Sequence, residues 1–175
     1  ASRDGRCFDD LMQERTDEEV AALKKKWGTS EDLLEAEDRI KAIAIDMVEH
    51  YVEQIMPNGF KAQVVCSSKL AAIRYRQQIE LAIADRLAEE RAKPEWDDRL
   101  PETARPRHRD EELVQQLAML QAVVVVSSDG TNEPAIITEA RKHAREVDAV
   151  KNFKKPFNAE EPNTGIAFLV VCDML

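Results

Sequence analysis

Three short polar segments directly follow apolar runs in this sequence, and their residue types are the ones best suited to chemistry: Cys66–Lys69, Ser127–Gly130 and Cys172–Leu175. In the first segment, Ser67 and Ser68 stand between a strand-like run and a helical pattern, and Lys69 comes next. Free backbone N–H groups at a helix start, a hydroxyl and an ammonium group together favour an anion such as phosphate. The simpler interpretation is that a serine caps the helix. Spacing alone favours the cap.

The sequence lacks the common local motifs of nucleotide binding and of metal-dependent nucleases. It has neither G-x-x-x-x-G-K-[ST] nor G-x-G-x-x-G, so this chain by itself shows no nucleotide cradle. No acidic residue is followed two places later by lysine, which removes the commonest carboxylate-lysine pattern of such nucleases. The histidines have no convincing partner in sequence, and a solvated or packed role is favoured over catalysis for each: His50, His108 and His143.

The densest positive region lies between residues 141 and 155 of an otherwise acidic chain. Two interpretations of it stay open, a solvated helix face or contact with a phosphate backbone. Interleaved acidic residues weaken the second interpretation. The basic residues concerned are Arg141, Lys142, His143, Arg145, Lys151, Lys154 and Lys155.

Length and composition limit the class of protein. At 175 residues the chain has the length of one ordinary domain, and its composition (43% hydrophobic, 34% charged, 5% aromatic) is typical of a helix-rich globular protein. A net charge of −9 argues against a surface covered with nucleic acid but permits a local basic patch. There is no run of roughly 20 apolar residues and no apolar signal region, so we expect a cytoplasmic protein without a membrane partner. Three cysteines without C-x-x-C spacing indicate reduced thiols: Cys7, Cys66 and Cys172.

The first part of the chain predicts helices followed by a strand. Residues 1–29 read as a connector and a short helix, with a capping box at Thr16 and a stop at Gly28. A second helix is predicted from near Ser30, and Pro57–Gly59 ends it. Its apolar residues are spaced three and four apart, as in a helix face that packs against a larger apolar surface: Ile40, Ile43, Ala44, Met47, Val48, Tyr51 and Ile55.

The rest of the chain alternates predicted strands and helices. The strands are Ala62–Cys66, Ala122–Ser128 and Ile166–Cys172, and the continuous β-branched run of the second indicates cover on both faces. The first strand is followed by a helical apolar pattern that includes Leu70, Ile73, Ile79, Leu81, Ile83 and Leu87 and that Pro94 closes. Residues 95–110 are predicted to form a charged surface loop, and Glu111–Leu120 a helix. One or two polar helices are predicted within Ile136–Val150, followed by an irregular segment from Lys151 to Pro162.

These elements predict an α/β fold with a parallel sheet and right-handed crossovers. The carboxyl ends of parallel strands meet at one edge of a sheet, where ligands bind. The three polar segments should therefore lie together.

Several segments, in order, resemble the restriction (motor) subunit of type I restriction-modification enzymes. They are KAQVVCSSKLAAIRY, VVVVSSDG and FKKPFNAEEPNTGIAFLVVCDML, preceded by EDLLEAEDRIKAIAIDMVEHYVEQIMPNGFKA. The resemblance extends from about Ser30 to Leu175. In that family the last segment continues into a T-G-F-D-A-P turn, so we expect a fragment in which 30–175 is the second RecA-like motor domain, truncated within the fifth helicase motif and incomplete at the C-terminal edge of its sheet.

The resemblance implies an enzyme as part of a larger protein. These subunits carry a nuclease domain and two RecA-like domains of helicase superfamily two. They bind ATP and magnesium between the motor domains, translocate and cleave double-stranded DNA, and assemble with modification and specificity subunits. The first motor domain, which holds the phosphate loop, is absent from this chain. As the second motor domain, this chain would supply half of the interdomain ATP site. We expect the fragment alone to bind no ATP or magnesium and to be inactive.

The resemblance also assigns roles to the strand ends. Ser67, Ser68 and Lys69 belong to the fourth helicase motif and would contact the DNA backbone. Ser127 and Ser128 would face the same DNA track from the neighbouring strand end. The fifth motif, which couples this track to the ATP cleft, would begin at Asp173, Met174 and Leu175. An alternative hypothesis is a non-catalytic α/β protein-interaction module that docks a partner through the apolar helix face from Ile40 to Ile55.

Overall fold

The computed structural model describes residues 36–128, 130 and 133–172. Contacts divide the chain into two compact units, Ala1–Arg39 and Ile40–Leu175. Of the first unit, residues 36–39 are described, and residues 37–39 begin helix α4. The architecture below is that of the second unit. The predicted boundary at residue 30, the short helix near Thr16 and the helix start near Ser30 lie outside the described residues.

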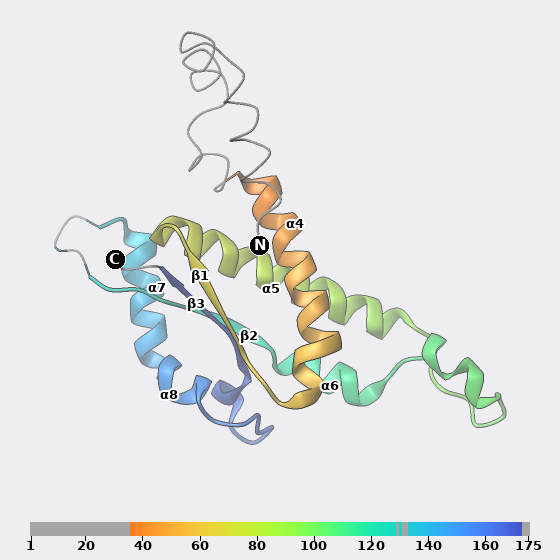
Figure 1. The fold of residues 1–175 in the computed structure, drawn as a ribbon. Helices are drawn as coiled ribbons and strands as arrows, with labels where there is room; N and C mark the ends of the chain where they lie inside the picture. Colours follow the sequence, from red (N-terminus) through yellow and green to blue (C-terminus); the bar gives the residue numbers. More distant parts are fainter. Residues whose placement is uncertain (1–35, 129, 131–132, 173–175) are drawn as a thin grey trace, which may run out of the picture. The chain divides into compact units, whose positions relative to one another are not determined.

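Three parallel strands form the centre of the second unit (Figure 1): β1 (Ala62–Cys66), β2 (Gln121–Val125) and β3 (Ile166–Cys172). Their order is β1-β3-β2, so the last of these strands in sequence lies between the other two. The register pairs Cys66 with Cys172 and Val125 with Val171. This aligns the carboxyl ends of all three strands at one edge of the sheet. The predicted α/β parallel sheet is confirmed in this small form.

Strand burial follows from sequence and position. The first five residues of β3 are buried, as are the three central residues of β2, because both strands carry continuous apolar side chains. In β1 the exposure alternates, and Val65 is 62% exposed. The predicted cover on both faces is confirmed at the centre of β2. β1 is less covered, and it pairs only with β3 among the described strands.

The predicted end of the second strand is wrong. The strand stops at Val125, whereas the apolar run suggested Ser128. Its ladder with β3 has its last pair at Val125 and Val171. Val126 stays apolar because it is buried in the core after the backbone has left the ladder.

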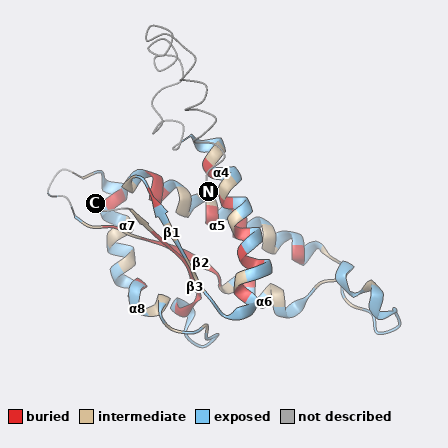
Figure 2. Ribbon diagram, in the orientation of Figure 1, coloured by how far each residue is buried: buried red, intermediate tan, exposed pale blue. Residues whose placement is uncertain are grey.

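Helix α4 (Glu37–His50) continues through a π-helical turn (Tyr51–Ile55) and a 3₁₀ turn (Met56–Asn58). Gly59 ends the segment with a φ of 72°, a left-handed conformation that glycine adopts without strain. The ring of Tyr51 lies 4.6 Å from that of Phe168 in β3, measured between centroids. Ala44 and Val48 are buried in the same core, and Figure 2 marks buried residues along α4. The predicted apolar stripe is confirmed, and it covers the sheet.

Helix α5 (Lys69–Ala92) packs against the sheet, and the helix ends just before Pro94, as predicted. Its buried face includes Ala72, Ile73, Ile79 and Ile83. Leu70 and Leu81 are 43% and 56% exposed, so their predicted place in the apolar face is wrong.

The remaining helices complete the two sides of the sheet. They are α6 (Glu111–Met119), α7 (Ala135–Glu146) and α8 (Ala149–Phe153). Of the one or two polar helices predicted after β2, two are observed. The predicted surface loop before α6 contains an exposed 3₁₀ helix (Glu102–Arg107). One core cluster joins α4 and α5 to Val124, Phe168 and Val170. A smaller cluster on the other face joins Ala149 of α8 to Val123 and Leu169.

Candidate functional site

Ser68 immediately precedes α5 and has an extended backbone with a φ of −142°. Its Oγ accepts a hydrogen bond from the Ala71 N–H at 3.0 Å. This bond satisfies one of the N–H groups that the start of a helix leaves without a backbone partner. The predicted serine cap is thus confirmed at Ser68, while Ser67 lies exposed next to it.

Lys69 connects two of the predicted polar segments. Its Nζ donates a hydrogen bond to the Ser127 carbonyl at 2.9 Å, from the segment after β2. It also pairs with Glu133 Oε1 at 2.6 Å. The Lys69 side chain is only 13% exposed, so its charge is held within the protein surface. The strand ends after β1 and β2, which flank the central β3, are therefore joined by this one side chain.

Glu133 is the residue of this site that sequence reasoning missed. Its second oxygen, Oε2, pairs with Arg141 of α7, and the Arg141 guanidinium also donates to the Ser127 carbonyl at 2.8 Å. Glu133 is 64 residues from Lys69 and 8 from Arg141 along the chain. No local spacing indicates such a cluster, because it depends on the fold bringing α5, α7 and the end of β2 together.

The electrostatics of this cluster are those of a nearly buried ion network. The side chains of Lys69, Arg141 and Glu133 are 13%, 14% and 10% exposed. Two cations face one carboxylate, so these three side chains carry one excess positive charge. The Nε of Arg141 is buried without a hydrogen-bond partner. An unsatisfied donor of this kind usually has a structural cost, since removal from water is not compensated.

The other predicted site residues are placed as follows. Ser128 is exposed, as is Ser67, so both hydroxyls lie at the surface near the ion network. Ser127 is half-buried, and its carbonyl oxygen accepts from both cations. Asp173, Met174 and Leu175 lie outside the described residues. The structure thus brings Lys69 and Ser127 into direct contact and leaves Ser67 and Ser128 accessible.

Cys66 and Cys172 lie opposite each other in adjacent strands. The pKa of the Cys66 thiol is raised to about 11, mainly by burial and to a lesser extent by the neighbouring Cys172. At neutral pH Cys66 is therefore protonated and a poor nucleophile. Both cysteines carry thiols, which agrees with the prediction for these two residues; Cys7 lies outside the described part.

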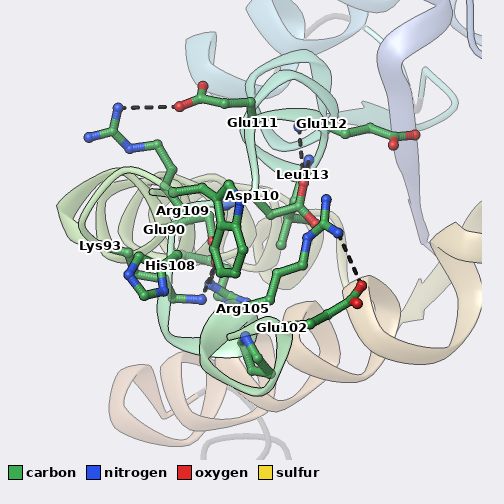
Figure 3. Close-up of a pocket in the computed structure, with 13 residues that line it drawn as sticks. Glu90, Lys93, Glu102, Arg105, His108, Arg109, Asp110, Glu111, Glu112 and Leu113 are labelled. Carbon is green, nitrogen blue, oxygen red and sulfur yellow. Dashed lines mark hydrogen bonds and ion pairs between the residues drawn. The ribbon is translucent and has the colours of Figure 1, made fainter. Parts of the chain in front are cut away.

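A cavity lies elsewhere, at the C-terminal end of α5 (Figure 3). It is an open hollow of about 800 Å³ with a mixed lining of acidic and basic side chains. Trp96 and His108 contact edge to face with centroids 5.2 Å apart. His108 is therefore packed, as predicted. At 1.5 Å per residue, α5 separates this hollow from Lys69 by roughly 30 Å.

A buried carboxylate organises the wall of this hollow. Glu90 is fully buried and accepts hydrogen bonds from Lys93 Nζ at 2.7 Å, Arg86 Nη1 at 3.2 Å and the Asp110 N–H at 3.0 Å. Burial alone would raise the pKa of Glu90, but these hydrogen bonds hold it below its ordinary value. Glu90 ties the end of α5 to the start of α6. No nucleophile or general base is oriented by this arrangement, so we interpret it as structural.

The basic region 141–155 is divided by the structure. Lys142, Lys151 and Lys155 form exposed ion pairs with acidic neighbours at 3.7, 3.6 and 2.6 Å. Pairs of this kind are typical of a solvated face. Arg141 differs because it is largely buried in the ion network at the strand ends.

Across 36–128, 130 and 133–172 there is no group of three side chains that could ligate a metal ion. No helix within these ranges has the length and apolar character needed to cross a membrane.

The fold and this edge define the class of protein: a mixed α/β chain with a three-stranded parallel sheet, helices on both faces, and cations gathered at the carboxyl ends of the strands. No family model, no curated protein sequence and no solved structure matches the chain.

Proposed function

We propose that the chain is part of the motor of a type I restriction enzyme, namely its second RecA-like domain, and that its strand ends contact the backbone of double-stranded DNA. The contact between Lys69 and the Ser127 carbonyl carries the proposal. It joins the two segments that the sequence resemblance assigns to the DNA track. A polar edge at the carboxyl ends of parallel strands is also the usual place for a ligand in α/β proteins.

The residues of this chain would bind and orient the phosphates. Ser67 and Ser128 have exposed hydroxyls that can donate to phosphate oxygens. Lys69 and Arg141 add positive charge behind them. In the longer subunit, ATP would bind more tightly to the closed arrangement of the two motor domains and so favour closure. Closure would then move these contacts along the DNA.

ATP and magnesium would be bound mainly outside this chain. The sequence has no phosphate loop, and the part that the structure describes has no cluster of metal ligands. The residues present do not form a nucleotide site by themselves. We therefore assign this chain no step of ATP hydrolysis.

The test is duplex DNA binding by the chain, measured by fluorescence anisotropy at low and moderate salt, together with an ATPase assay. We expect weak, salt-sensitive binding and no ATP turnover. Replacing both exposed serines, Ser67→Ala with Ser128→Ala, should weaken binding about a hundredfold, because two hydrogen bonds to charged phosphates are lost.

A matched control removes an exposed hydroxyl far from this edge. Thr103 is exposed in the 3₁₀ helix before α6, and the variant Thr103→Ala should leave DNA binding unchanged. Measurable ATP turnover by this chain, or equal DNA affinity in the serine double variant and the control, would contradict the proposal. The alternative of a protein-docking module loses its predicted surface, since much of the face from Ile40 to Ile55 is buried within the chain.

A further inference from the structure

Glu133 occupies the space between two cations at the strand ends. Its two carboxylate oxygens pair separately with Lys69 Nζ, at 2.6 Å, and with Arg141 Nη2. We propose that Lys69 and Arg141 form a phosphate-binding site, and that the carboxylate of Glu133 fills this site until a phosphate group replaces it. The carboxylate stands in for the phosphate by accepting the same two charged donors.

The unsatisfied donor of Arg141 distinguishes this cluster from a completed ion pair. Both oxygens of Glu133 are engaged, yet Arg141 Nε is buried with no acceptor. Glu133 divides its two oxygens between the cations, one with Lys69 and the other with Arg141 Nη2. A phosphate has more acceptor oxygens, and can accept from Lys69 Nζ and from both Nη2 and Nε of the guanidinium. The arrangement is therefore completed better by phosphate than by Glu133.

The cations are held in place by a group that is independent of Glu133. The Ser127 carbonyl accepts from Lys69 Nζ at 2.9 Å and from Arg141 Nη2 at 2.8 Å. When the carboxylate leaves, these two bonds keep the ammonium and guanidinium groups close together. A site whose donors are already positioned loses less freedom on binding and so has higher affinity.

Access and charge also fit an exchange of ligands. Each of the three side chains keeps between 10% and 14% of its surface exposed, so solvent reaches the cluster. Without Glu133 the site carries two positive charges, which a phosphate with one or two negative charges offsets. The competing interpretation is a purely structural ion network that ties α7 to α5.

The test measures binding of inorganic phosphate by isothermal titration calorimetry. Glu133→Gln removes the competing charge and should tighten phosphate binding about tenfold, the value of one charged hydrogen bond. Adding Arg141→Lys to this variant keeps the charge but removes Nε, and should reverse most of the gain. The matched control is Glu161→Gln, which neutralises an exposed partner of Lys155 outside the site. Phosphate affinity should not change in this control.

The wild-type chain provides a measurement that does not depend on a variant folding. Inorganic phosphate should raise its thermal midpoint with saturation, and sodium chloride at equal ionic strength should not. A folded Glu133→Gln variant that binds phosphate no more tightly than wild type overturns the proposal. So does a thermal midpoint that phosphate and chloride change equally.

The identification of the phosphate as part of a DNA backbone rests on the proposed function. Binding of a second ligand, duplex DNA, tests the phosphate site and the DNA-motor proposal separately. If the ligand is a DNA backbone, Glu133→Gln should also tighten binding of a duplex oligonucleotide. Tighter phosphate binding without duplex binding in any variant would support this site and contradict the DNA-motor proposal. Duplex binding that depends on Ser67 and Ser128, together with phosphate binding that Glu133→Gln does not tighten, would support the motor proposal and overturn this inference.

Discussion

At the scale of single residues, Glu90 shows how a fully buried charge can stabilise this fold. It accepts from two cations and one backbone N–H, and it joins the end of α5 to the N-cap residue of α6. Its lowered pKa means that the native state favours the ionised form more than the unfolded chain does. This contribution to stability is present above the unfolded pKa of about 4.3 and is lost as pH falls through the lower native pKa.

The substitution Glu90→Gln should therefore destabilise the chain at neutral pH by about 2 kcal/mol, the size of hydrogen bonds to a charged group. The difference from wild type should shrink in acid, where the wild-type carboxylate is protonated. Urea denaturation at several pH values measures both effects. The adjacent exposed Glu89→Gln is the control, and a pH-independent difference for Glu90→Gln would contradict the argument.

Residue roles could be predicted where they depend on neighbours in sequence. The Ser68 cap follows from its place between a strand and a helix. A role for Lys69 in binding an anion was predicted, but its ion pair with Glu133 was not. That pairing depends on the distance between α5 and the segment after β2, which local spacing does not encode.

At the scale of elements, the entry to β3 depends on a close approach of two backbones. A Cβ at Gly165 would lie 2.1 Å from the Met119 carbonyl oxygen at the end of α6. A change of side-chain rotamer cannot relieve this clash, because the contacting atom belongs to the backbone. The packing of β3 beside α6 thus requires glycine at this position.

We expect Gly165→Ala to lower the free energy of unfolding by about 1–3 kcal/mol, the range for overpacked positions. Gly59→Ala is the comparison, since a Cβ there meets no atom within 4 Å and the cost of about 1 kcal/mol comes from its φ of 72°. Urea denaturation measures both changes in unfolding free energy, provided that the dependence of this free energy on urea concentration is the same for all variants. A stability of Gly165→Ala equal to or above that of Gly59→Ala would argue against the close approach.

The elements themselves were largely predictable. The residue bounds of β1 and β3 agree with the sequence pattern, because apolar runs there end at polar residues. The end of β2 was misplaced because Val126 is needed in the core but not in the ladder. The order β1-β3-β2 does not follow from periodicity, since strand neighbours are chosen by packing across the whole sheet.

At the scale of the whole molecule, net charge limits how strongly this chain can bind DNA. The charge of −9 repels phosphates, so affinity must come from a few local cations. If Lys69 and Arg141 together neutralise about two phosphates, the logarithm of the association constant should fall with a slope of about −1.8 against the logarithm of salt concentration. Anisotropy titrations over a salt series measure this slope. A slope near zero would show that phosphates are not the contact.

The central position of β3 has a consequence for how the chain acquires its structure. Among the strands that the structure describes, β1 and β2 do not pair with each other, so neither has a partner in this sheet until residues 166–172 are in place. During synthesis, more than 100 residues after β1 must emerge before the sheet can close. Contacts this distant in sequence slow folding and leave strand edges open meanwhile. A nascent chain that ends before β3 should therefore be a substrate for chaperones rather than a partly formed version of this domain.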